Sequence, residues 1–129
     1  MNHRTTLLSA GLLGLTGVAL GALGAHALRD LLLERGMTVA WETAARYHII
    51  HTVALLAAAV GLRSSTGPVQ RRLGWAAACW VAGTVLFSGS LYALALGGPH
   101  WMGPVTPLGG LVLMAGWVCV VAAAVPKES

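Results

Sequence analysis

Four long apolar stretches alternate with short polar segments along the chain, and each is long enough to cross a lipid bilayer. They cover residues 5–28, 44–62, 73–97 and 105–125. A membrane-spanning helix needs about 20 predominantly apolar residues, and the only formally charged residue within the four stretches is Arg46. The pattern predicts an all-α membrane protein, with residues 1–129 forming a single transmembrane domain of four transmembrane helices in an up-down bundle.

The segment after the first stretch has a different pattern. Residues 29–35 place charges on both sides of three leucines, and Gly36 then provides a natural helix stop. A straight helix from residue 5 to residue 35 would be about 46 Å long, which exceeds the roughly 30 Å hydrocarbon core. We therefore predict a short amphipathic extension after the first helix, which leaves the membrane or lies along its surface. The next helix is expected to start near Thr38.

Several residues at the expected helix ends carry signals of their own. Thr106 before Pro107 is typical of an N-cap followed by the first helical position, because proline has no amide hydrogen to leave unpaired. Tryptophan is enriched at both membrane interfaces. We therefore expect Trp41 and Trp101 at the outer interface and Trp75 at the inner one.

Composition agrees with this pattern and excludes a water-soluble enzyme. The chain is 57% hydrophobic and only 9% charged, whereas an average soluble domain is about 25% charged. The net charge of +4 does not indicate nucleic-acid binding, because the basic residues are scattered at the span ends and form no stripe with interleaved aromatic residues. The lipid bilayer is therefore the expected partner.

The charges at the helix ends predict an orientation. With four spans, both termini and the loop near residues 63–72 share one side of the membrane. That side holds the basic residues Arg4, Arg63, Arg71, Arg72 and Lys127 against the single acid Glu128. The other side holds equal numbers of basic and acidic residues: Arg29, Arg35, Arg46, Asp30, Glu34 and Glu42. Positive residues favour the cytoplasm, so a bacterial inner-membrane location with both termini cytoplasmic is predicted.

The first stretch presents a face of glycines. Its helix-packing candidates are Gly14, Gly17, Gly21 and Gly24. Helices in lipid associate largely through close backbone approach, so small residues mark their contacts. This face is expected to pack against another span of the same chain or against a partner helix.

Intramembrane polar residues gather in the outer half of the predicted bundle. The candidate polar cluster consists of His26, His48, His51, Ser88, Ser90, Tyr92 and Thr106. Polar groups inside a membrane are costly and usually face the bundle interior or a water-filled cavity. The inner half holds no comparable set, which makes this cluster the main functional clue in the sequence.

The cluster allows several interpretations. His26, His48 and His51 could ligate a metal, and His26 with a histidine of the second span could hold a haem between helices. Histidine, serine and tyrosine could also line a path for protons or small solutes. The simplest alternative is structural, with apolar rings whose nitrogen atoms bond to carbonyl groups and serines that join one helix to another. No catalytic set accompanies these residues, so no enzyme is predicted and no cofactor is assigned.

Four blocks of the chain resemble a known family. They are residues 21–28 (Gly-Ala-Leu-Gly-Ala-His-Ala-Leu), residues 41–51, residues 86–96 around Ser88-Gly89-Ser90, and residues 104–117 beginning Pro-Val-Thr-Pro. In this order and spacing they are similar to the domain of unknown function numbered 423, the YgdD-like small bacterial inner-membrane proteins, which has an animal branch named transmembrane protein 256. The resemblance implies four helices in the inner membrane. It implies no activity and assigns no catalytic residue. Some relatives carry glutamine at the position of His48, which makes His26 and His51 the more general pair.

Two functions remain as hypotheses. The first is a small non-enzymatic accessory or structural subunit that associates with other membrane proteins or with itself. The second is a protein that handles a ligand, haem, metal or ion through the polar cluster.

Overall fold

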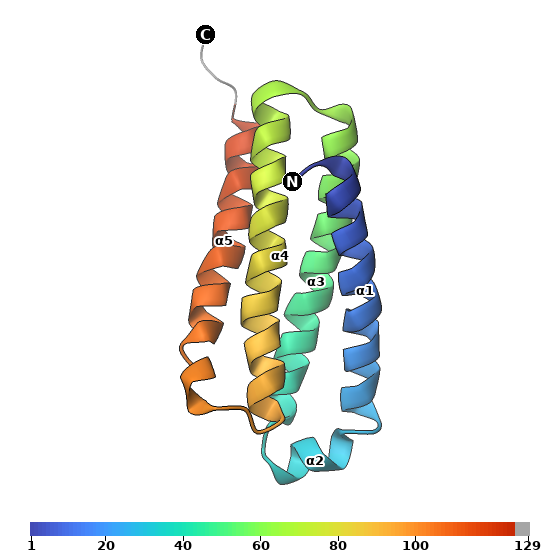
Figure 1. Cartoon of the computed structure of the whole chain (residues 1–129), viewed down its shortest axis with the longest axis vertical. Coiled ribbons are helices and arrows are strands. Elements are labelled where there is room, and N and C mark those ends of the chain that lie inside the picture. The colour runs from blue at the N-terminus through green and yellow to red at the C-terminus, as the bar shows by residue number, and fades with distance from the viewer. Residues whose placement is uncertain (126–129) are drawn as a thin grey trace.

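The computed structural model describes residues 1–125 and is all α-helical in this part of the chain (Figure 1). The helices are α1 (His3–Ala25), α2 (Arg29–Glu34), α3 (Thr38–Ser64), α4 (Gly67–Ala95) and α5 (Val105–Ala124), with a single 3-10 turn, η1 (His100–Met102), before α5. Four helical segments are long and apolar enough to span a membrane, the last of them being η1 together with α5. The prediction of an all-α, four-helix membrane protein is confirmed.

The four long helices pack in chain order. α1 packs on α3, α3 on α4, and α4 on α5, whereas α1 contacts α4 only slightly (Figure 1). α3 and α4 are therefore central, with 44% and 39% of their spans buried, while α1 and α5 lie at the edges with 11% and 17% buried. Most of the exposed surface of the edge helices is apolar, as contact with lipid requires.

The helix ends differ in detail from the sequence expectation. α3 begins at Thr38, as predicted. α4 begins earlier than the apolar stretch, at Gly67, because Pro68 in its first turn has a backbone angle suited to a helix start. α4 ends at Ala95, shortly before Gly97, whose φ of 90° is compatible with glycine rather than with a helix. The proposed N-cap at Thr106 is wrong, since Pro104 holds that position and Thr106 lies inside α5.

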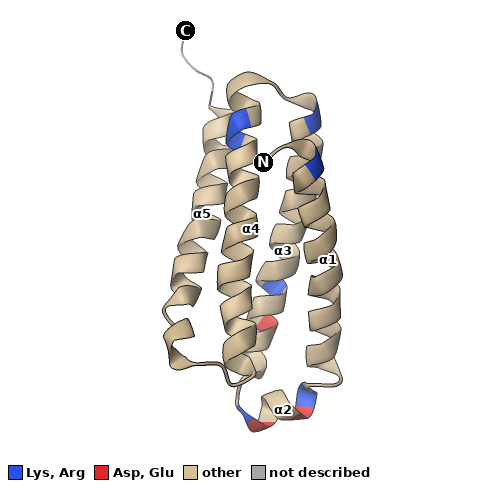
Figure 2. Cartoon of the chain, viewed as in Figure 1, with Lys and Arg blue, Asp and Glu red and all other residues tan. Residues whose placement is uncertain are grey.

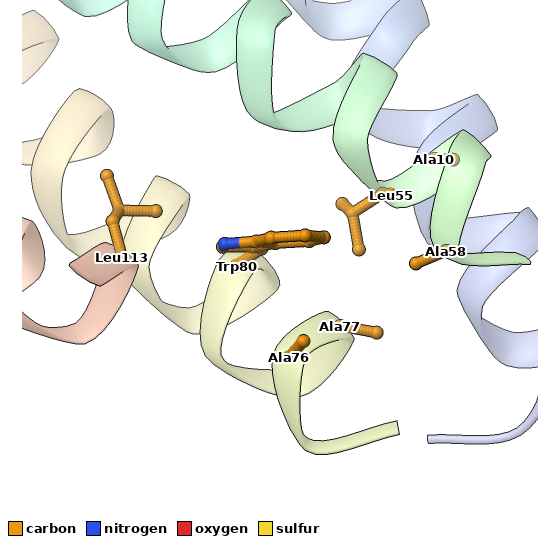
Figure 3. Close-up of a cluster of buried hydrophobic side chains, with 7 residues drawn as sticks. All are labelled: Ala10, Leu55, Ala58, Ala76, Ala77, Trp80 and Leu113. Atoms are coloured by element: carbon orange, nitrogen blue, oxygen red, sulfur yellow. The ribbon is translucent and has the colours of Figure 1, made fainter. Parts of the chain in front are cut away.

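One apolar cluster fills the half of the bundle where the chain begins. The Trp80 ring lies between Leu55 of α3 and Leu113 of α5, with small alanines of α3 and α4 around it (Figure 3). Small residues let the helices approach, and the single large ring fills the space that remains. This cluster joins the two central helices to α5.

A second apolar cluster closes the other half and corrects one expectation. Trp41 is 2% exposed, so its ring is buried inside the bundle and does not face lipid headgroups; its Nε1 donates to the Leu20 carbonyl of α1 at 2.9 Å. Its ring packs edge-on against Tyr92, with centroids 4.6 Å apart. Trp75 and Trp101, by contrast, are 64% and 68% exposed, as interface residues would be.

The predicted amphipathic segment forms α2, which covers one end of the bundle (Figure 1). Its Leu32 is 1% exposed and packs in the cluster around Trp41 and Tyr92. At the end of α2 the Arg35 guanidinium lies against Gly97, in the loop after α4. Leu32 and Arg35 therefore connect α2 to the ends of both central helices.

The charges separate along the long axis of the molecule. Within residues 1–125, the charged side chains at the end formed by the start of α1 and the loop between α3 and α4 are all arginines, whereas acidic and basic residues occur together in α2 (Figure 2). Lys127, one of the basic residues used to predict the orientation, lies outside the described residues.

Candidate functional site

His48 sits at the centre of a hydrogen-bonded chain that links three helices. It is 4% exposed, with Nδ1 3.2 Å from the Tyr92 hydroxyl of α4 and Nε2 3.4 Å from the Thr16 hydroxyl of α1. The Thr16 hydroxyl already donates to the Leu12 carbonyl at 2.9 Å. Nε2 therefore donates to Thr16, and Nδ1 accepts from Tyr92, which is the pattern of a neutral imidazole.

His51 also has both ring nitrogens engaged. Its Nδ1 lies 2.8 Å from the Tyr47 carbonyl, to which it must donate, so that Nε2 accepts from Nε1 of Trp117 at 3.2 Å. The ring packs edge-on against Trp80 and Trp117. His51 thus ties α3 to α5, helices that are not consecutive in the packing order.

The hydroxyl groups of the candidate cluster make further links between helices. Ser88 is 1% exposed and donates to the Ala44 carbonyl of α3 at 2.8 Å. Ser90 donates to the Phe87 carbonyl at 3.0 Å and lies 2.6 Å from the hydroxyl of Thr106 in α5. Because the Ser90 hydrogen is used in the first bond, Thr106 is the donor in the second.

The seven candidates do not form one site. His26 is exposed and is the C-cap residue of α1. Residues 1–125 contain no group of three His, Cys, Asp or Glu side chains placed to hold a metal ion. In addition, the acceptor nitrogens of His48 and His51 already bond to Tyr92 and Trp117. The geometry of the described residues therefore does not support the interpretation in which His26, His48 and His51 ligate one metal.

Three of the candidates border a small cavity between α1, α3 and α4. It measures about 180 Å³ and is lined by His48, Ser88 and Tyr92, together with Thr84, Gly89 and apolar residues of α1 and α4. The remaining candidates, His26, His51, Ser90 and Thr106, do not line it. The expected single polar cavity is thus reduced to three residues whose polar atoms all bond to other parts of the chain.

The glycine face of α1 is used within the chain at three positions. A Cβ on Gly14 would meet Thr52, one on Gly17 would meet Ile49 and His48, and one on Gly24 would overlap the Trp41 ring. Gly21 has no atom within 4 Å of such a Cβ. The face therefore lets α1 approach α3, and it leaves little of this stripe for a partner helix.

Two residues that complete the hydrogen bonds were missed in the sequence. Thr16 is a polar residue in the middle of the first apolar stretch. Its expected depth in the membrane could have indicated a contact with one of the histidines. Trp117 gave no signal of its own, since a tryptophan deep in a span does not reveal which helix its indole N–H faces.

Removing the hydroxyl of Tyr92 tests the structural role of this hydrogen-bonded chain. Tyr92→Phe leaves the acceptor nitrogen of buried His48 unpaired, so the free energy of unfolding in detergent should fall by about 1–3 kcal/mol. Tyr47→Phe is the matched control, because Tyr47 is 41% exposed and its loss should cost less than about 0.5 kcal/mol. Equal stability of the two variants would argue against a role for the Tyr92 bond.

Comparison of the sequence with known proteins identifies a family and several relatives. The family of proteins of unknown function numbered DUF423 matches over residues 20–110. The chain is 38% identical to the UPF0382 inner membrane protein YgdD of Escherichia coli K12, over 97% of this chain and 92% of that protein. It is 41% identical to a UPF0382 membrane protein of Staphylococcus epidermidis, over 82% and 83% of the two chains. A UPF0382 membrane protein of Schizosaccharomyces pombe is 35% identical, over 84% and 91%. No solved structure matches the chain.

Proposed function

The chain belongs to the DUF423 family of membrane proteins, and from that premise we propose that it is a small non-enzymatic subunit that associates with another membrane protein. The buried polar side chains support this role, because His48, His51 and Ser88 bond to other helices of the chain. A contact with a partner protein would therefore lie on the outside of the bundle.

The observation that carries the proposal is a charged and apolar face on α3. Glu42 and Arg46 are exposed. Further along the helix, Ile50, Val53 and Val60 are 50%, 61% and 66% exposed. Successive positions in this set are separated by about one or two helical turns, so they lie along one side of the helix. Ionisable residues within membrane spans almost always face protein or water rather than lipid.

The depth of Arg46 supports a protein partner on this face. α3 has 27 residues, hence a length of about 40 Å against a hydrocarbon core of about 30 Å. With the excess shared between both ends, Arg46 lies about 7 Å inside the hydrocarbon region. The partner we propose is a transmembrane helix of another protein that carries a carboxylate at the depth of Arg46 and an apolar surface beside Val53.

Site-specific crosslinking in the native membrane tests this face. A photoreactive amino acid at Val53 should give an adduct with another protein. The same residue at Val18 of α1, which is 67% exposed, should not. Arg46→Leu should reduce the Val53 adduct about fivefold or more, since an interhelical polar contact is worth about 1–2 kcal/mol in model peptides. Arg63→Leu, which removes an exposed arginine from the other end of the same helix, should leave it unchanged.

Two results would contradict this assignment. Equal adducts at Val53 and Val18 would mean that the α3 face has no special partner. An adduct containing two copies of this chain alone would mean that the face serves self-association and not association with another protein.

The location and orientation are part of the same proposal. The Escherichia coli relative is named an inner membrane protein, which supports the inner membrane for this chain. Arg4, Arg63, Arg71 and Arg72 gather at one end (Figure 2), which supports cytoplasmic termini by the positive-inside rule. A cysteine can be placed at Ser65 and exposed to an impermeant thiol reagent outside the cell. Labelling of this cysteine would contradict the predicted orientation.

A further inference from the structure

A groove opens at the basic end of the bundle, where the start of the chain lies against α4. It has a volume of about 550 Å³, and its walls include Met1, Asn2, Gln70, Arg71, Gly74 and Trp75. We call it the N-terminal groove. It is separate from the polar residues around His48 and from the α3 face, because no residue is common to the groove and either of them.

The groove is built by a close contact between the chain start and α4. The amino group of Met1 donates to the Gly74 carbonyl at 3.0 Å. A Cβ on Gly74 would come within 2.7 Å of the Met1 carbonyl oxygen, so the contact requires glycine there. Asn2 then accepts a hydrogen bond from the Thr5 amide at 3.0 Å and starts α1. Residues before α1 thus form one wall, and the first turns of α4 form the other.

Arg71 is the charged side chain that lines this groove, beside the Met1 amino group that bonds to Gly74. Its neighbour Arg72 donates to the Ala122 carbonyl of α5 and is therefore engaged within the chain. Arg71 is exposed and lines the groove together with Gln70. The Gln70 amide nitrogen donates one of its two hydrogens to the Leu62 carbonyl at 3.5 Å, which leaves the other for a ligand. Within residues 1–125 the three acids, Asp30, Glu34 and Glu42, lie in α2 and at the start of α3, at the other end of the bundle (Figure 2). The field in the groove is therefore positive.

The apolar part of the groove continues toward the membrane. Trp75 is 64% exposed, and an indole ring favours the boundary between lipid headgroups and acyl chains. Gly74 and Ala78 lie beside it and present little side-chain bulk. The groove therefore joins a donor-rich, positive head to an apolar track in the direction expected of a lipid.

We propose that the N-terminal groove binds the headgroup of an anionic phospholipid. The phosphodiester accepts hydrogen bonds from the Arg71 guanidinium and from the remaining Gln70 amide hydrogen. Phosphatidylcholine has the same phosphodiester, so the preference for an anionic headgroup comes from the positive field of the groove, which opposes the cationic choline group. The upper part of an acyl chain lies along Trp75 and Ala78. Basic pockets beside transmembrane helices are an established way of binding lipid headgroups.

Native mass spectrometry of the full chain in detergent tests this site. With added phosphatidylglycerol, the wild-type chain should keep one lipid, whereas phosphatidylcholine with the same acyl chains should dissociate. Arg71→Gln should weaken phosphatidylglycerol binding about fivefold, the effect of one basic residue near an anionic surface. Arg63→Gln removes the same charge from the same end but outside the groove, and it should bind like the wild type. Both arginines are exposed, so neither substitution should impair folding.

Several outcomes would overturn the proposal. Equal losses in Arg71→Gln and Arg63→Gln would show that the general charge of this end attracts lipid. Equal retention of both phospholipids, or of neither, would show that the groove does not select an anionic headgroup. Inorganic phosphate that raises the melting temperature as much as phosphatidylglycerol would identify the ligand as free phosphate.

Discussion

Gly109→Ala is expected to separate α5 from α4 and to lower the free energy of unfolding by about 3 kcal/mol, the upper part of the range for overpacking. A Cβ at this position would collide with the backbone nitrogen of Phe87 and would lie 2.8 Å from its Cα. The Leu86 carbonyl carbon would be only 2.9 Å away. Because these atoms belong to the α4 backbone, no change of rotamer relieves the clash, and the two helices must move apart.

The next residue supplies the control for this experiment. A Cβ on Gly110 would meet only the Phe87 ring, at 3.7 Å, which is ordinary van der Waals contact. Gly110→Ala should therefore raise the free energy of unfolding by up to about 1 kcal/mol, because alanine is the better helix former. Both variants can be compared by denaturant titration in detergent micelles. If Gly109→Ala were as stable as Gly110→Ala, the close contact between α4 and α5 would be incorrect.

Trp41→Ala is expected to have an equally large effect in the same half of the bundle, where α2 and α3 meet α4. The side chain is 2% exposed and packs with Leu32, Tyr92 and Ala95. Its truncation therefore leaves a cavity between α2 and the central helices. Loss of a buried tryptophan costs about 3–5 kcal/mol. The bond from Nε1 to the Leu20 carbonyl is lost as well, and the measurement is again the free energy of unfolding in detergent.

Trp101→Ala controls for the general cost of losing an indole ring. Trp101 is 68% exposed in the turn η1, and its removal should change stability by less than about 0.5 kcal/mol. A similar small change in Trp41→Ala would indicate that the Trp41 ring is not buried and faces the membrane interface, as an aromatic belt would place it.

The fold could be predicted from the sequence because its main signal is long and unambiguous. Four apolar stretches with the single charge Arg46 have few alternatives to membrane-spanning helices. Trp41 was misassigned for a local reason, since a tryptophan near a helix end looks the same whether it anchors the helix or is buried. Only the pairing of α1 with α3, which puts Gly24 against the ring, distinguishes the two.

The candidate site was predicted less well, because its contacts depend on how the helices are rotated. His48 and His51 are three residues apart and lie about 60° apart around α3. That difference suffices for His48 to reach α1 and α4 while His51 reaches Trp117 of α5. Their depth in the membrane was visible in the sequence, but the neighbours that satisfy each nitrogen were not.

These contacts assign the buried polar residues a structural role. The histidines and serines hold helices that have little hydrophobic drive to associate in lipid. Interhelical hydrogen bonds of this kind are each worth about 0.6 kcal/mol on average, so the bundle relies on several of them together with glycine contacts. Function is then expected at the exposed face of α3 and not inside the bundle.

Native mass spectrometry of the chain, extracted mildly from its own membranes without overexpression, tests the proposed subunit role most directly. We predict that the wild-type chain appears in an assembly whose mass includes a different polypeptide, and that Arg46→Leu releases it from that assembly. A wild-type chain that appears only alone, or only as multiples of its own mass, would contradict the role of a subunit of another membrane protein.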